Sequence, residues 1–293
     1  MTMPESPVER VAHCVRRVAI LGSPQKPAAR EVMERTRKWL IGRAEVVFAE
    51  ITNDSSAVLD ARPDLLMVLG GDGTLIAAVH NLRRQQIPIV GINLGKLGYL
   101  ADFTLDELQQ EGHFLFSGEL PLTRRIMMQV TLEHMDGRQH ETPAVNDCVI
   151  HAGPPYHMVQ ATVEVDSDEV AVVRGDGLIV ATPSGSTAHN LAAGGPIVEP
   201  TGETFILTPI CPHALAYRPL VMDAGRKIVI RLAQANEGTT VATDGSVLHP
   251  FQASDRIVIT RYGADFLLVR NPRRSEWHAL RRKLRWGEGP NMH

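Results

Sequence analysis

The most constraining feature of this sequence is an apolar run that ends directly in a cluster of glycines. Residues 65–69 are all apolar, and Gly-Gly-Asp-Gly-Thr follows at residues 70–74. A short apolar run bounded by turn residues is typical of a buried strand in a parallel sheet, and residues 75–82 predict a helix after it. The glycines therefore lie where a strand ends and a helix begins, which is where ligands bind in open α/β sheets.

The residue types in this loop suit a phosphate group. Glycine lets the backbone approach a ligand closely, successive N–H groups form an anion-binding concavity, and a helix N-terminus adds partial positive charge. Asp72 adds a carboxylate and Thr74 a hydroxyl. The alternative is a plain turn in which the glycines relieve strain and Asp72 caps the helix. The sequence contains neither a Walker A pattern nor a Gly-x-Gly-x-x-Gly fingerprint.

Strands and helices alternate through the first 120 residues. Strands are predicted within residues 17–24, 44–49, 65–69 and 87–93, and helices within residues 27–41, 75–85 and 104–117. This alternation indicates a parallel sheet with right-handed crossovers. Pro88 is expected at the start of its strand, because proline cannot donate to the ladder. Residues 1–16 are expected to be a loose leader.

The pattern changes after about residue 121. Short extended segments, parted by turn residues, predict a β-sandwich or a similar β-rich fold; they include residues 127–133, 159–165, 177–181, 205–208 and 227–232. We expect an α/β domain with a parallel sheet over residues 1–120, a sandwich-like β-rich domain over 121–270, and a C-terminal helix and tail over 271–293. The helix is predicted from Ser275 to Gly287, with Trp277, Leu280 and Leu284 docking on a domain.

Composition excludes several classes of protein. The formal net charge of −3 gives no basic surface for nucleic acid, and no apolar run approaches the roughly 20 residues of a membrane helix. The first 17 residues lack the apolar region of a secretory signal. Cys14, Cys148 and Cys211 are widely spaced and predict reduced thiols. We therefore expect a cytoplasmic protein without nucleic-acid or membrane partners.

Two further segments carry polar groups suited to a ligand. A second glycine-rich loop covers residues 91–100, where Asn93 could bind a ligand or brace the loop; it should neighbour the Asp72 loop if the two strands are adjacent. The pair Asn146-Asp147 interrupts an apolar run. Its donors and acceptors could grip a ribose diol or the edge of a base, and the alternative is an Asx turn at a strand end.

The segment from Arg174 to Val198 places two glycine clusters around a hydroxyl-rich loop. The Arg174 guanidinium could pair with a phosphate or bridge to a carboxylate. Asp176 could bind a ribose hydroxyl or hold Arg174. A loop with only a structural role is the alternative. Hydroxyl donors to phosphate or ribose oxygens are offered by Thr182, Ser184, Ser186 and Thr187.

Several of these segments resemble the NAD kinase family. Gly-Gly-Asp-Gly-Thr is similar to its loop, and the diacylglycerol and sphingosine kinases carry a close relative. The run 174–198 resembles the family block Gly-Asp-Gly-Leu, Thr-Pro-Thr-Gly-Ser-Thr-Ala-Tyr and Gly-Gly-Pro. Matches also cover residues 91–100, 146–147, 208–215, 218–221 and 283–287. The likeness spans nearly the whole chain in order, whereas lipid kinases are not expected to show the later blocks.

The resemblance implies transfer of a phosphoryl group from ATP, or from polyphosphate, to the 2′-hydroxyl of the adenosine ribose of NAD, which gives NADP. It also implies a divalent metal cation, expected to be Mg²⁺ with unknown protein ligands, and a homodimer or homotetramer. Asp72 would accept the proton, and Gly70, Gly71, Gly73 and Thr74 would hold the donor. The implied NAD contacts are Asp72, Gly73, Asn146, Asp147, His157, Arg174, Asp176, Thr187, Ala188, His189, Asn190, Leu191, Ala192 and Ser246. A lipid kinase and a non-catalytic NAD-binding protein remain as alternatives.

The sequence departs from the family pattern at five positions. His189 stands where the family has tyrosine, and Ser246 where many members have glutamine; both changes concern the contacts to NAD and the choice between NAD and NADH. His80 replaces a common arginine and concerns the phosphate donor. Ser184 for threonine and Tyr99 for phenylalanine are mild changes.

Overall fold

The computed structural model describes residues 9–54, 56–95, 98–275 and 277–285. The chain divides into two compact units. The first contains Met1–Arg124 and Phe266–His293, and the second contains Arg125–Asp265. The second unit is therefore an insertion in the sequence of the first.

The first unit is built on a seven-stranded mixed sheet with the order β1-β6-β19-β5-β4-β2-β3. Its parallel strands are β2 (Arg17–Gly22), β3 (Glu45–Ile51), β4 (Leu65–Gly70), β5 (Pro88–Asn93) and β19 (Phe266–Val269). The first four agree with the parallel sheet that the sequence predicts. Pro88 begins β5, as expected. β1 (Glu9–Ala12) pairs antiparallel with β6 (Glu119–Arg125). Part of the predicted loose leader is thus an edge strand.

The α-helices of this unit are α1 (Ala29–Leu40), α2 (Asp72–Leu82), α3 (Leu105–Glu111) and α5 (Trp277–Leu284). α3 begins with a capping box between Thr104 and Glu107. The helix predicted to continue to residue 117 changes at Gly112 into the 3₁₀ helix η2 (Gly112–Phe116). A Cβ at Gly112 would lie 2.8 Å from the Trp39 ring, so close packing against α1 requires glycine at this break.

The second unit consists of two six-stranded sheets in which every pairing is antiparallel. One sheet contains β11 (Asp168–Gly175), β10 (Val159–Val165), β15 (Ile228–Gln234), β18 (Arg256–Arg261), β7 (Met128–Glu133) and β8 (Gln139–Ala144). The other contains β14 (Leu220–Asp223), β13 (Thr204–Ile210), β12 (Gly177–Ala181), β9 (Asp147–His151), β16 (Thr240–Thr243) and β17 (Ser246–Pro250). Side chains of both sheets form one buried core, in agreement with the predicted sandwich.

The sheet that contains β9, β12 and β13 is also buried on the face opposite this core. Val149, Ile179 and Ile206 on that face pack with Ala193 and Val198 of the loop that follows β12. This loop contains the short helices η3 (Ser184–Thr187) and α4 (His189–Ala192). The hydroxyl-rich segment is therefore anchored on the sheet.

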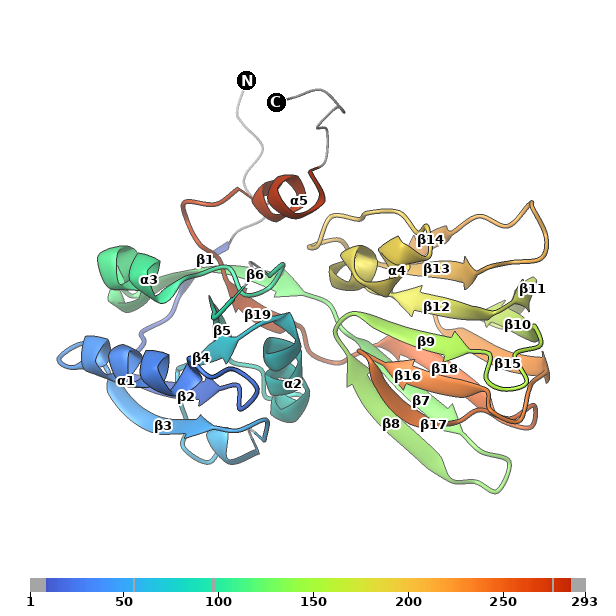
Figure 1. Ribbon diagram of the computed structural model, residues 1–293, viewed down its shortest axis with the longest axis horizontal. Helices are drawn as coiled ribbons and strands as arrows, with labels where there is room; N and C mark the ends of the chain where they lie inside the picture. Colours follow the sequence, from blue (N-terminus) through green and yellow to red (C-terminus); the bar gives the residue numbers. More distant parts are fainter. Residues whose placement is uncertain (1–8, 55, 96–97, 276, 286–293) are drawn as a thin grey trace. The chain divides into compact units, whose positions relative to one another are not determined.

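Two predictions about the end of the chain need correction. Residues 266–270 were expected in the β-rich domain, but β19 lies in the first sheet between β5 and β6 (Figure 1). Its four apolar residues suit a buried strand of either sheet. In α5 Leu280 is buried, whereas Trp277 is 52% and Leu284 37% exposed, so only one of the three predicted docking side chains is covered. Gly287, the predicted stop, lies outside the described residues.

Candidate active site

The Asp72 loop connects β4 to α2 as the sequence predicts. Gly71 is the N-cap residue of α2 and has extended backbone. A Cβ at Gly70 would lie 2.4 Å from Thr74 Oγ1, so this position requires glycine. At Gly71 and Gly73 an added Cβ would meet no atom within 4 Å. The first turn of α2 is therefore open at both glycines, as an anion-binding loop requires.

The Asp72 side chain reaches the second glycine-rich loop. Its carboxylate accepts the backbone N–H groups of Tyr99 (2.8 Å), Leu100 (3.0 Å) and Ala101 (3.1 Å). A Cβ at Gly98 would lie 2.0 Å from Asp72 Oδ1, so this glycine allows the approach. Asp72 thus binds across two loops in addition to standing at the start of α2.

The two loops are neighbours because β4 and β5 are adjacent, which confirms the expectation. Gly70 lies opposite Asn93 in the register, and the Leu94 N–H donates to the Gly70 carbonyl at 3.2 Å. Asn93 Oδ1 accepts the Gly95 N–H at 2.6 Å. Of the two alternatives for Asn93, this contact is the loop brace.

α5 adds a cation that sequence analysis did not assign to the site. Lys283 Nζ lies 3.8 Å from Asp72 Oδ2 and 4.1 Å from the centre of the Tyr99 ring. Burial, and then the charge of Asp72, raise the pKa of the Tyr99 phenol. The only signal in the sequence was that Lys283 falls within a matching tail segment.

In the second unit, Asp244 holds the turn that carries the Asn146-Asp147 pair. Its carboxylate accepts the backbone N–H groups of Val145 (2.7 Å), Asn146 (2.7 Å) and Asp147 (3.0 Å). From the other side, a Cβ at Gly185 would lie 2.0 Å from the Asn146 carbonyl oxygen. Sequence analysis missed Asp244, although the Asp-Gly turn at residues 244–245 was visible.

Asp147 is buried beside a second carboxylate. It is 4% exposed and begins β9. Burial first, and the charge of Asp244 second, raise its pKa to about 7, while a hydrogen bond from the His189 backbone opposes the shift. Near neutral pH the carboxyl can therefore either donate or accept a hydrogen bond.

The structure brings the predicted segments 146–147 and 187–192 together. The His189 backbone binds Asp147, and the His189 ring lies 5.3 Å from the His151 ring. Burial, followed by the neighbouring His189, lowers the pKa of His151. His189 and Ala192 are exposed, and Thr187, Ala188 and Leu191 are half-buried.

Several polar side chains of this loop make internal hydrogen bonds. Asn190 is fully buried; its amide donates to the Ser186 and Pro196 carbonyls, both at 3.0 Å, and accepts from the Thr208 hydroxyl at 2.7 Å. The Thr182 hydroxyl donates to the Val145 carbonyl at 2.5 Å. These groups brace the loop rather than face a ligand in this structure.

Apart from residues 187–192, the predicted residues of the second unit fall into two groups. Asp147 lies opposite Ala181 in the β9–β12 register, and His151 lies opposite Gly177. The two ends of this strand pair are about 13 Å apart, at about 3.3 Å per residue. The first end has Asn146, Asp147 and, after the β16–β17 turn, Ser246; the second has Asp176, with Arg174 and His157 beyond it.

The residues at the second end are mostly exposed. Arg174 Nε donates to Gln160 Oε1 at 2.7 Å on the neighbouring strand, which differs from the suggested contact with Asp176. Arg174, Asp176 and His157 are all exposed, and so is Ser246 at the first end. Contacts of these residues with NAD stay a prediction.

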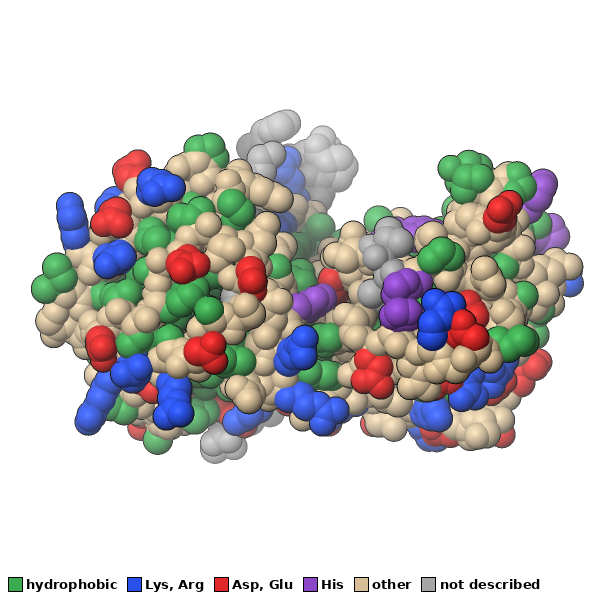
Figure 2. Space-filling model, turned by 90° about the horizontal axis from the view of Figure 1, so that it is seen from below, with side chains coloured by type: hydrophobic (Ala, Val, Ile, Leu, Met, Phe, Trp, Pro, Cys, Tyr) green, Lys and Arg blue, Asp and Glu red, His purple; other side chains and the backbone are tan. Residues whose placement is uncertain are grey.

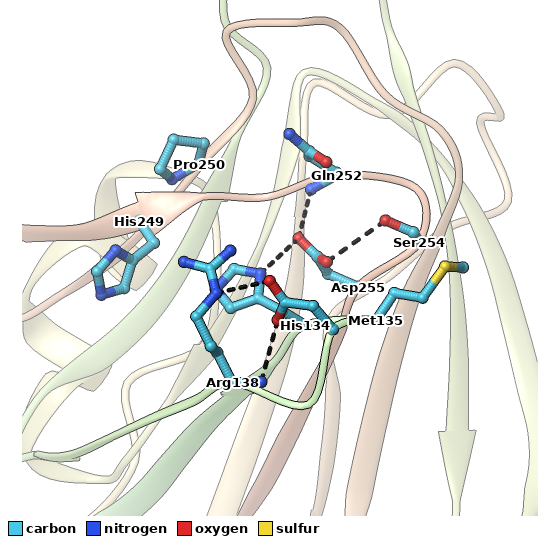
Figure 3. Close-up of a pocket in the computed structure, with 9 residues that line it drawn as sticks. His134, Met135, Arg138, His249, Pro250, Gln252, Ser254 and Asp255 are labelled. Carbon is cyan, nitrogen blue, oxygen red and sulfur yellow. Dashed lines mark hydrogen bonds and ion pairs between the residues drawn. The ribbon is translucent and has the colours of Figure 1, made fainter.

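A separate cavity of about 320 Å³ lies in the second unit (Figure 3) and contains none of the predicted site residues. His134 Nδ1 lies 3.1 Å from the buried Asp255 carboxylate, and the rings of His140 and His249 are 3.5 Å apart.

On the face shown in Figure 2, histidines lie beside Lys, Arg, Asp and Glu side chains in a mixed pattern. Among the described residues, no group of three His, Cys, Asp or Glu side chains is arranged to hold a metal ion.

No described helix has both the length and the apolar character needed to cross a membrane. Cys14, Cys148 and Cys211 are free thiols, as predicted. Burial, followed by the charges of Asp147 and Asp244, raises the pKa of the Cys148 thiol. This thiol is therefore poorly reactive.

An open glycine loop with a carboxylate, at the carboxyl end of a parallel strand, is typical of enzymes that bind phosphate groups. Comparison with known families specifies which one. Residues 24–120 match the model of the ATP-NAD kinase N-terminal domain, and residues 145–270 match that of the ATP-NAD kinase C-terminal domain.

Individual relatives agree with these matches. The NAD kinase of Rhodopirellula baltica is 35% identical over 272 residues, which are 92% of this chain and 86% of the relative. The NAD kinase of Syntrophobacter fumaroxidans is 35% identical over an alignment of 284 residues that covers 94% of this chain and 100% of the relative. The chain belongs to the NAD kinase family.

Solved structures of two kinases resemble this one. An NAD kinase from Archaeoglobus fulgidus in complex with ATP superposes with a TM-score of 0.72 and 27% identity, covering 92% of this chain and 98% of the other. The yeast NADH kinase complexed with NADH has a TM-score of 0.84 and 23% identity, covering 96% and 90%. The yeast enzyme supports the fold alone.

Proposed function

We propose that this protein is an NAD kinase that transfers a phosphoryl group from ATP to the 2′-hydroxyl of the adenosine ribose of NAD, giving NADP. The observation that carries the proposal is the Asp72 carboxylate at the open start of α2, in a chain that matches both domains of the family. The ATP complex of the Archaeoglobus relative supports ATP as donor. Polyphosphate is the alternative donor.

Phosphoryl transfer depends mainly on positioning and on neutralising charge. The N–H groups and the dipole of the first turn of α2 would bind the donor phosphates, with Gly71 and Gly73 leaving room for them. Thr74 would complete this loop. Asp72 would accept the proton of the ribose hydroxyl, which must lie about 2.6–3.2 Å from one of its oxygens.

NAD would be held mainly by the second unit. Asn146 and Asp147 offer the donors and acceptors that grip a nucleotide, on a backbone fixed by Asp244. The remaining proposed contacts are Asp72, Gly73, His157, Arg174, Asp176, Thr187, Ala188, His189, Asn190, Leu191, Ala192 and Ser246. Asn190 is fully buried in this structure, and its amide braces the loop.

A divalent cation, Mg²⁺, would neutralise the charge of the donor phosphates when bound. Mg²⁺ is commonly held by one or two carboxylates together with substrate phosphates and water. Asp72 is the carboxylate of this loop, and its oxygens already accept three backbone N–H groups. The donor phosphates and water would therefore supply most ligands of the metal, and its protein ligands are left unassigned. A homodimer or homotetramer in the cytoplasm remains part of the proposal. Light scattering of the purified protein tests the oligomeric state.

The test is an assay of the purified protein with ATP, Mg²⁺ and NAD that reads NADP through an NADP-specific dehydrogenase. Loss of a general base typically costs about 10²–10⁴ in rate. Asp72→Asn should therefore lower turnover by that factor, with circular dichroism and NAD binding by calorimetry as controls. Near-normal turnover by the folded variant would remove Asp72 from its assigned role. NAD binding without turnover by the wild type would favour a non-catalytic NAD-binding protein.

A lipid kinase is the less favoured alternative. It would share the Asp72 loop, but the match of residues 145–270 to the ATP-NAD kinase C-terminal domain argues against it. Flotation with lipid vesicles and a lipid phosphorylation assay would detect it.

A further inference from the structure

The C-terminal helix α5 brings one lysine to the carboxylate of the proposed active site. Lys283 Nζ lies 3.8 Å from Asp72 Oδ2. Both residues belong to the first unit, and both side chains are 28% exposed. Lys283 follows Asp72 by about 200 positions in the sequence, yet it places a positive charge at the point where the proposed mechanism brings negatively charged groups together.

This ion pair has little value for stability. A charge-assisted hydrogen bond between an ammonium and a carboxylate is about 2.7–2.9 Å long, which is shorter than the observed 3.8 Å. The Asp72 oxygens already accept three backbone N–H groups. Partly exposed pairs of this kind contribute little to folding, so the contact points to a role in charge placement.

The Tyr99 ring restrains the ammonium without satisfying its hydrogen-bond donors. Lys283 Nζ lies 4.1 Å from the ring centre, which is within the range of a cation–π interaction. The Tyr99 backbone N–H binds the same Asp72 oxygen that faces Lys283. The ring and the carboxylate therefore hold the cation beside Asp72 while its three N–H groups can turn to another acceptor.

We propose that Lys283 is a catalytic residue of the phosphoryl transfer, whose ammonium donates hydrogen bonds to the non-bridging oxygens of the phosphoryl group in flight. The proposal rests on the proposed function. The acceptor hydroxyl would lie within hydrogen-bond distance of Asp72, and the phosphorus about 3–3.5 Å from that hydroxyl oxygen. A flexible lysine that already lies 3.8 Å from the carboxylate can reach this group.

The reaction balances without proton transfer by Lys283. A bond forms between the ribose oxygen and the phosphorus as the bond to the bridging oxygen of the donor breaks. ADP leaves with the electron pair of that bond, and the hydroxyl proton goes to Asp72. Lys283 stays protonated and opposes the charge on the phosphoryl oxygens, as preorganised donors do in other active sites.

The test compares Lys283→Met with Lys283→Arg in two assays of ATP and NAD: single-turnover reactions with enzyme in excess give the rate of the chemical step, and steady-state reactions give KM for NAD. Removal of one preorganised donor typically costs about 10²–10³ in rate. Lys283→Met should lower the rate of NADP formation by that factor with less than about a threefold change in KM for NAD. Lys283→Arg should recover at least tenfold over the Met variant, because it keeps the charge. Arg282→Met, at an exposed basic neighbour on α5, is the matched control and should leave the rate unchanged.

Wild-type rates in Lys283→Met would overturn the inference and leave the proposed function intact. A lower melting temperature with a raised KM and an unchanged rate would assign Lys283 a structural role and would also overturn it. Lys283→Gln is the second neutral variant, should the Met variant not fold. Absence of NADP from the wild type itself would instead reject the proposed function.

Discussion

At the residue scale, Asp147 is a carboxyl whose surroundings disfavour its negative charge. It is 4% exposed, and its close neighbours include the Asp244 carboxylate. The folded protein raises its pKa from 3.8 to about 7. Between these two values the folded state holds a proton that the unfolded state has released, so the contribution of Asp147 to stability is full at low pH and is lost as the pH rises towards 7.

We expect Asp147→Asn to remove this pH dependence, because an amide does not ionise. The free energy of unfolding of the variant relative to the wild type should rise between pH 5 and pH 7 by roughly 2 kcal/mol. Urea titrations of both proteins at several pH values measure the difference. A difference that stays constant with pH would show that the carboxyl is not held neutral.

At the scale of elements, the β16–β17 turn stabilises a segment almost a hundred residues away in sequence. Asp244 has a positive φ of 47°, and its carboxylate accepts three backbone N–H groups of residues 145–147. Unsatisfied buried donors cost about 1–3 kcal/mol each. The turn therefore maintains the shape of the Asn146-Asp147 segment.

Asp244→Ala should lower the free energy of unfolding by about 2–4 kcal/mol and weaken NAD binding. Urea unfolding and calorimetry measure the two effects. Asp223→Ala, which removes a carboxylate that caps the single Gly225 N–H in an exposed turn, is the matched control and should have a small effect. Equal effects of the two variants would contradict the role of Asp244.

Local patterns were sufficient to predict β4, the glycine loop and α2, because an apolar run, glycines and a helix are neighbours in sequence. They also predicted that the 91–100 loop lies beside Asp72. They could not reveal that Asp244 binds residues 145–147, or that Gly112 must be small to meet Trp39. Four apolar residues at 266–269 carry no information about which sheet they join.

At the scale of the whole molecule, the first unit depends on a strand from the end of the chain. β19 lies between β5 and β6, inside the sheet. A protein that ends at residue 124 would leave this position empty and expose the unpaired edges of β5 and β6, which favours aggregation.

We therefore expect residues 125–265 to fold alone, with β-type circular dichroism and cooperative unfolding, whereas residues 1–124 should not. Joining residues 266–293 to residue 124 through a short Gly/Ser linker should restore a cooperative first unit. Denaturant unfolding of the three fragments tests this expectation. A cooperative transition of residues 1–124 alone would show that β19 is dispensable.

The position of β19 and Lys283 has a consequence for synthesis on the ribosome. The Asp72 loop emerges early. The seven-stranded sheet that carries it cannot be completed until β19, which ends at residue 269, has left the exit tunnel, and Lys283 emerges later still. The inserted unit contains only its own strands and can fold during this interval. A nascent chain therefore carries the Asp72 loop without α5 for most of its translation, and the contact between Lys283 and Asp72 forms only when α5 is made.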